Sequence, residues 1–207
     1  MKKALLPFIG LILCLNIYGQ ECADVKFKIR GYFYAGSSVV DTVSPGGFYE
    51  ANNSPKPIDQ TIQRLSPTAD FNIIAKVDST ASLSTKIRFF KVFIVNKTDS
   101  VVALPAQDSR IYLKRQVFYK GEWQDVEYLP SSWCGNSYHT VSIRPNEFWE
   151  FDAPCLSGKI EAKFRFELYV SKDVSLYSNE FLGSFNKRQL TKEQGHTPSG
   201  LMDSYNN

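Results

Sequence analysis

The segment from residue 131 to residue 139 carries the densest group of side chains that could do chemistry. Cys134 is a potential nucleophile, and His139 follows it by five positions as a potential general base. This spacing argues against a thiol enzyme, because no helical turn is expected here that would bring the imidazole back to the sulfur. The only other histidine is His196, in the C-terminal tail. A hydrolase that uses Cys134 and His139 is therefore an alternative prediction and not the main one.

Three acidic residues, Glu147, Glu150 and Asp152, lie within six positions around Trp149. Paired carboxylates beside an aromatic ring are typical of glycoside hydrolases. In an extended strand, however, Glu150 and Asp152 simply share one face with Phe148, while Glu147 lies on the other. A hydrolase that acts through Glu150 and Asp152 is thus a second form of the same alternative.

The chain shows no pattern for a metal or a cofactor. Its two histidines, His139 and His196, are 57 positions apart and its cysteines form no close pair, so the usual zinc spacings are absent. Calcium loops, phosphate-binding glycine loops and the nucleophile elbow of serine hydrolases are absent as well. The sequence therefore predicts no metal, no cofactor and no enzymatic activity.

Aromatic side chains near the expected strand ends carry the remaining functional signal. The candidate ligand-binding residues are Trp123, Trp133, Tyr138, His139 and Trp149. Such side chains bind a partner protein or stack on a sugar ring. The competing interpretation places two of the three tryptophans in the core, with Trp123 or Trp133 as the central one.

The N-terminal residues 1–20 have the layout of a signal peptide. Lys2 and Lys3 precede about twelve apolar residues, which is too short for a membrane-spanning helix of about 20. We therefore expect export to the periplasm or the extracellular space, with no membrane insertion after the leader is removed. Removal of both lysines leaves 22 basic against 21 acidic residues, a net charge of +1. A nucleic-acid partner is excluded on this ground, because its affinity depends on basic side chains.

Three cysteines remain after removal of the leader, and an oxidising compartment favours a disulfide between two of them. We expect Cys134 and Cys155 to pair, because they close a loop of about 22 residues, which would stabilise the fold by about 3 kcal/mol. The pairings of Cys22 with Cys134 or with Cys155 stay open, because spacing alone does not decide among them.

The elements that must position these residues are strands. The chain is 14% aromatic, and alternation of apolar and polar residues is clearest over residues 160–170. The other expected strands span residues 25–34, 71–77, 87–95, 111–119, 123–128, 141–151 and 176–185, with a tight turn at Lys120 and Gly121. Residues 44–68 are rich in proline and glycine and predict a long irregular loop with one short helical turn at 58–65.

These elements predict an all-β fold, an antiparallel β-sandwich of about seven to nine strands with immunoglobulin-like topology. We expect one domain over residues 21–186. The polar residues 187–207 are expected to form a flexible tail.

Two segments resemble a known group of proteins: Ser-Trp-Cys-Gly-Asn-Ser-Tyr-His at 132–139, and Tyr-Ser-Asn-Glu-Phe at 177–181 followed by Gly-Ser-Phe-Asn at 183–186. They are similar to sequences of uncharacterised exported immunoglobulin-like β-sandwich proteins of Gram-negative bacteria. The resemblance covers residues 85–189. It implies the fold and export, and it implies no activity.

The main functional prediction is a non-enzymatic exported module that binds an envelope protein, a peptide or a glycan. In its specific form, residues 133–139 present the contact surface together with residues 44–68. Besides the hydrolase, a purely structural or protease-inhibitory sandwich is a further alternative.

Overall fold

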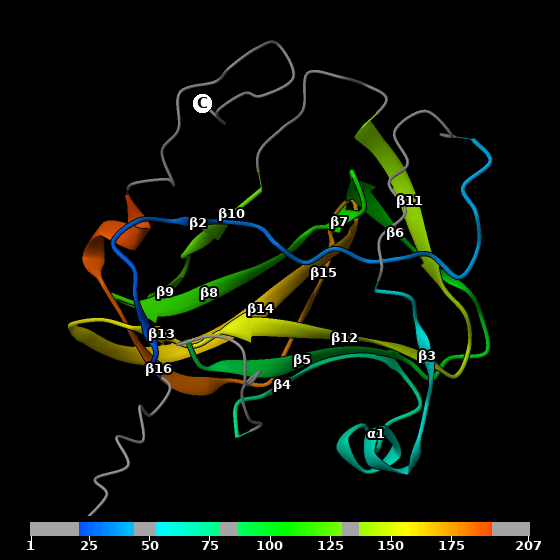
Figure 1. Cartoon of the computed structure of the whole chain (residues 1–207), viewed down its shortest axis with the longest axis horizontal. Coiled ribbons are helices and arrows are strands. Elements are labelled where there is room, and N and C mark those ends of the chain that lie inside the picture. The colour runs from blue at the N-terminus through cyan, green and yellow to red at the C-terminus, as the bar shows by residue number, and fades with distance from the viewer. Residues whose placement is uncertain (1–20, 44–52, 79–86, 130–136, 192–207) are drawn as a thin grey trace, which may run out of the picture.

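The computed structural model describes residues 21–43, 53–78, 87–129 and 137–191 of the chain. In this part of the protein, strands form two facing layers and helix is almost absent, so the predicted all-β antiparallel sandwich is confirmed (Figure 1). The expected signal peptide, residues 1–20, lies outside the described residues.

One layer is a four-stranded sheet in the order β3–β12–β5–β4. Its strands are β3 (Lys56–Pro57), β12 (Glu147–Pro154), β5 (Phe89–Asn96) and β4 (Phe71–Lys76). β5 lies between two antiparallel neighbours and is buried along most of its length. This confirms that the apolar run at residues 87–95, which alternates little, belongs to a central strand.

The other layer consists of two sheets. The first has the order β11–β6–β7, with β11 (Tyr138–Ile143), β6 (Val102–Gln107) and β7 (Arg110–Ile111). The second has the order β15–β14–β8–β9, with β15 (Val174–Tyr177), β14 (Ile160–Ser171), β8 (Leu113–Tyr119) and β9 (Glu122–Asp125), and β16 (Phe181–Phe185) also pairs with β14. Only Tyr112 separates β7 from β8, and its carbonyl accepts a hydrogen bond from the Tyr169 N–H, so the two sheets continue into each other.

The main core lies between the layers. It is made of side chains from the inner faces of both, including Phe90, Val92, Trp149, Phe166 and Leu168. Burial of these large apolar groups is the main stabilising contribution to the fold. The alternation predicted for residues 160–170 is confirmed, because Phe164, Phe166 and Leu168 are buried on one face of β14.

The N-terminal segment differs from the expected single strand at residues 25–34. It forms two short parallel pairs instead: β1 (Ala23–Asp24) with β13 (Leu156–Ser157), and β2 (Ile29–Arg30) with β10 (Glu127–Tyr128). The segment is divided because it runs first along β13 and then along β10, which lie in different parts of the sandwich. Six of the sixteen strands in the described residues are such two-residue pieces, which explains why there are more than the seven to nine expected. Immunoglobulin-like topology stays a prediction.

Residues 53–68 are more regular than the expected loop. They contain β3 and the predicted helical turn, α1 (Gln60–Leu65), which begins where the Asp59 carboxylate accepts the Ile62 N–H at 2.8 Å. Ile62 packs on Phe93 and Phe148, so α1 covers the outer face of the four-stranded sheet. Residues 44–52 of the expected loop lie outside the described residues.

The packed structure also continues past residue 186, where the flexible tail was expected to begin. Residues 187–190 form a 3₁₀ helix, η3 (Lys187–Leu190), and Gln189 is fully buried. Its side-chain oxygen accepts a hydrogen bond from the Asn186 N–H at 2.8 Å, and Leu190 packs on a small apolar cluster at this end of the sandwich. The domain therefore reaches at least residue 190, and residues 192–207 lie outside the described part.

Candidate binding surface

His139 is placed by β11 and is buried in the structure. Its Nε2 accepts a hydrogen bond from the Ser109 N–H at 2.7 Å. Ser109 and Asp108 form the β6–β7 turn with φ angles of 61° and 49°, a conformation that is unfavourable for residues with a side chain. The imidazole therefore supports a turn, which corrects its assignment as a ligand-binding residue. Cys134 and Trp133 lie outside the described residues.

The predicted Cys134–Cys155 disulfide is wrong, because Cys155 is bonded to Cys22. The pairing of β1 with β13 brings these two residues together, and the Ala23 N–H donates to the Cys155 carbonyl at 2.8 Å. This bridge was one of the alternatives that the sequence left open. Spacing favoured the shorter loop, but a long-range strand pairing decides the partner.

Glu150 and Asp152 share the outer face of β12, as predicted, and both are held in ion pairs. Lys91 Nζ lies 2.7 Å from one oxygen of Glu150 and 2.8 Å from Asp152, and Lys56 Nζ lies 3.0 Å from the other Glu150 oxygen. Burial alone would raise the pKa of Glu150, but its hydrogen bonds with Lys91 and Lys56 outweigh burial and lower the pKa. A general acid needs a raised pKa, so the geometry gives no support to a hydrolase at this pair.

Among the tryptophans that the structure describes, the one at the centre of the core is Trp149 and not Trp123. Trp149 is fully buried, and its indole N–H donates to the Gly36 carbonyl at 2.9 Å. It shares the inner face of β12 with Phe151, because alternate residues of a strand point to the same side. Trp149 is therefore a core residue, and its assignment as a ligand-binding residue is corrected.

Trp123 has a different position, on the outer face of the β15–β14–β8–β9 sheet. Its ring lies beside Phe118 with centroids 5.4 Å apart, and the Arg165 guanidinium carbon is 4.2 Å from the Trp123 ring centroid. The Tyr177 ring centroid lies 3.8 Å from the same guanidinium carbon. We call Phe118, Trp123, Arg165 and Tyr177 the outer sheet face.

Strand register explains why these four side chains meet. Phe118 is opposite Trp123, Gln116 is opposite Arg165, and Tyr177 is opposite Glu167. Side chains directly opposite in antiparallel strands are neighbours on one face. The outer sheet face therefore crosses four strands from β9 to β15.

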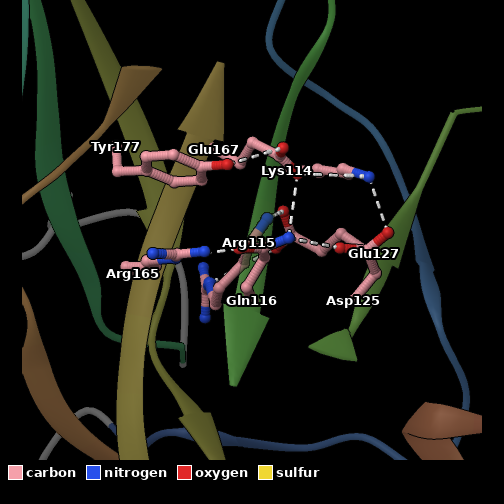
Figure 2. A network of polar contacts seen from close by, with 8 residues as sticks. All are labelled: Lys114, Arg115, Gln116, Asp125, Glu127, Arg165, Glu167 and Tyr177. Atoms are coloured by element: carbon pink, nitrogen blue, oxygen red, sulfur yellow. Dashed lines mark hydrogen bonds and ion pairs between the residues drawn. The ribbon is translucent and has the colours of Figure 1, made fainter. Parts of the chain in front are cut away.

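A polar network fixes the position of Arg165 (Figure 2). Its Nε donates to the Gln116 side-chain oxygen at 2.9 Å. The Gln116 amide nitrogen in turn donates to Asp125 at 2.9 Å and to Glu167 at 2.8 Å, so both ends of the amide are used. Arg165 is consequently held by one hydrogen bond and by two aromatic rings before any partner binds.

The charges of the network compensate one another. Lys114 Nζ lies 2.6 Å from Asp125 and 3.3 Å from Glu167, as the dashed lines in Figure 2 show. Burial would lower the pKa of Lys114, but hydrogen bonds with Asp125 and then the nearby carboxylate charges raise it. With Lys114 and Arg165 against Asp125 and Glu167, the network has no net charge. The outer sheet face offers aromatic and guanidinium groups for contact.

Tyr138 belongs to a second aromatic group in the same layer. It is partly exposed at the start of β11 and lies near Tyr112, whose ring centroid is 6.0 Å from that of Tyr169. Burial, followed by the neighbouring Tyr138 and Tyr169, raises the pKa of Tyr112. Tyr138 is therefore accessible at the surface, and its role as a contact residue stays a prediction.

Sequence reasoning selected Trp123 and Tyr138 but missed Arg165, Tyr177 and Phe118. A local signal did exist, because Arg165 lies among the outward-facing residues of the clearest strand. Its partners come from three other strands, however, and only the register brings them together.

In comparisons with known proteins, no protein family, curated protein or solved structure matches the chain. In the described residues, no group of three or more histidine, cysteine or acidic side chains is placed to hold a metal ion. Within the same residues, no helix has the length and apolar character needed to cross a membrane.

Proposed function

We propose that this protein is an exported, non-enzymatic binding module that engages a partner protein through the outer sheet face. The observation that carries the proposal is the contact of the Arg165 guanidinium with both the Trp123 and the Tyr177 ring. Tryptophan, tyrosine and arginine are the residues most enriched among those that dominate the energy of protein interfaces.

Pre-organisation favours this face further. An arginine that orders on binding loses side-chain entropy, whereas Arg165 is already fixed by Gln116 and two rings. A flat face of a sheet suits a protein surface, while small ligands prefer concave sites. Export is supported by the predicted leader and by the Cys22–Cys155 disulfide, since such bonds persist in oxidising compartments.

The test is chemical cross-linking of the purified protein in an envelope extract of the producing cell, followed by mass spectrometry. The variant is Trp123→Ala with Tyr177→Ala. The control is Tyr34→Ala, because Tyr34 matches Tyr177 in exposure, 44% against 47%, and also contacts an arginine, Arg110. We expect one partner protein to be recovered with the wild type and with the control.

For the double variant we expect recovery to fall about thirtyfold or more, which corresponds to the loss of about 2 kcal/mol typical of a dominant interface residue. Equal recovery with all three proteins would refute the proposal. Binding of the wild type to a glycan array, with no protein partner recovered, would assign the face to a glycan and would also refute it.

A further inference from the structure

A small pocket lies at one end of the sandwich, away from the outer sheet face. Its volume is about 140 Å³, and its apolar walls are formed by Phe90 of β5, Phe164 of β14, Phe181 of β16 and Leu156 of β13. Leu182, which is 81% exposed, stands at its rim. An apolar cavity of about 150 Å³ holds a molecule of the size of benzene.

The charged side chains that line this pocket are two arginines, Arg88 and Arg115, and among its described lining residues no carboxylate is present. Arg115 is 1% exposed and therefore presents a guanidinium from the protein interior. Both groups are cationic at any physiological pH. The pocket thus combines apolar walls with positive charge.

Arg115 is held in position by contacts with four side chains. Its Nε lies 3.4 Å from a Glu127 oxygen, and its Nη2 donates to the Tyr32 hydroxyl at 3.1 Å. The guanidinium carbon lies 5.3 Å and 5.2 Å from the ring centroids of Phe90 and Phe166.

Arg88 is positioned by the disulfide and not by the partners of Arg115. Its Nη2 lies 3.2 Å from both sulfur atoms of the Cys22–Cys155 disulfide, and Cys155 also lines the pocket. The disulfide therefore places an exposed cation beside the buried one. Arg115 is paired with the buried carboxylate of Glu127, and Arg88 adds an exposed positive charge at the same pocket.

We propose that this pocket binds a small free carboxylic acid whose apolar part is about the size of a phenyl ring. The apolar part packs among Phe90, Phe164 and Phe181, and the carboxylate accepts hydrogen bonds from Arg115 and Arg88. This site is separate from the outer sheet face and does not depend on the function proposed above.

Isothermal titration of the purified, disulfide-bonded protein with 3-phenylpropionate tests the site without any mutation. The matched control ligand is 3-phenylpropionamide, which has the same shape and no charge. We expect saturable binding of the acid and at least about tenfold weaker binding of the amide, because hydrogen bonds to charged groups are about twice as strong as neutral ones. Equal affinities, or no binding of the acid at millimolar concentration, would overturn the proposal.

A peptide that ends in phenylalanine presents the same chemistry through its C-terminal carboxylate. We therefore include the tripeptide Gly-Gly-Phe and expect it to bind more weakly than 3-phenylpropionate, because the pocket has room for little beyond one ring. Tighter binding of the tripeptide would overturn the assignment to a free acid.

The variant Arg88→Gln tests whether the acid binds in this pocket. Because Arg88 is exposed, the change leaves the buried Arg115–Glu127 ion pair intact. We expect it to weaken binding of the acid about tenfold. The control Arg144→Gln removes an exposed arginine from the β11–β12 connection and should leave binding unchanged. In ¹H–¹⁵N spectra the acid should shift the Gly183 and Arg88 amides most; shifts confined to other residues would place the ligand elsewhere and refute the proposal.

Discussion

Arg115 and Glu127 form an ion pair inside the sandwich, and both side chains are almost completely buried. Glu127 accepts hydrogen bonds from the Arg115 N–H at 2.9 Å and from the Tyr32 hydroxyl at 2.9 Å. Burial raises the pKa of Glu127 although the charge of Arg115 opposes the shift, and burial followed by the charge of Glu127 raises the pKa of Tyr32 well above its ordinary value. Glu127 therefore connects Arg115 and Tyr32 inside the sandwich.

At the residue scale we therefore predict that Glu127→Gln is strongly destabilising. The change leaves the Arg115 charge buried without its counter-ion, and breaking a buried pair costs about 3–5 kcal/mol of unfolding free energy. The control is Glu180→Gln, which removes a similar ion pair with Lys163 at 2.9 Å, but with side chains 50–60% exposed. There we expect a loss of less than about 1 kcal/mol.

Urea unfolding followed by tryptophan fluorescence measures both variants. If Glu127→Gln changed the free energy of unfolding no more than Glu180→Gln, the Arg115–Glu127 pair would not have the structural role assigned to it.

The β8–β9 hairpin is the element that carries Trp123, and its two-residue turn requires an unusual backbone. Lys120 and Gly121 have φ angles of 56° and 89°, and positive φ at both positions is typical of the type I′ turn that joins twisted strands. Glycine adopts this conformation without strain, while other residues lose about 1–2 kcal/mol. The turn predicted from the sequence at these two positions is confirmed.

At the element scale we predict opposite effects at the two turn positions. Gly121→Ala should lower the free energy of unfolding by about 1–2 kcal/mol, purely through the backbone, because an added Cβ would meet no atom within 4 Å. Lys120→Asn should raise it by a few tenths to about 1 kcal/mol, because asparagine tolerates positive φ.

Thermal unfolding checks this pair of variants. A change of 1 kcal/mol corresponds to about 2–4 °C in Tm for a protein of this size, so Tm should fall for Gly121→Ala and rise for Lys120→Asn. A rise for Gly121→Ala would contradict the turn assignment.

At the scale of the whole molecule, the Cys22–Cys155 disulfide closes a loop across a sequence separation of 133 residues. Because it ties the first described strand to the second half of the chain, it restricts the unfolded state strongly. In the chain-entropy model a loop of this length contributes about 4–5 kcal/mol. We predict a loss of this order for Cys22→Ser with Cys155→Ser, measured by urea unfolding without reductant.

Cys134→Ser is the matched control for the disulfide. It leaves the Cys22–Cys155 bridge intact, so the free energy of unfolding should stay within about 0.5 kcal/mol of the wild type. A loss of several kcal/mol for Cys134→Ser, or a Cys134–Cys155 peptide in a non-reducing digest, would contradict the assigned pairing.

The sequence by itself determined the local features of this protein. Alternation located β14, the run of β-branched and aromatic residues located β5, and glycine located the hairpin turn. Composition likewise located the short helix α1, and the outward-facing Trp123 was among the candidate contact residues.

Tertiary structure alone decided the features that depend on partners distant in the chain. Nothing local distinguishes Trp149, which is buried, from Trp123, which is half-exposed, or shows that His139 supports the turn at Ser109. The same holds for Cys155, whose partner follows from the parallel pairing of β1 with β13. Periodicity shows to which face of a sheet a side chain points, but the register between strands decides which side chains it contacts. The outer sheet face and the arginine-lined pocket both depend on that register.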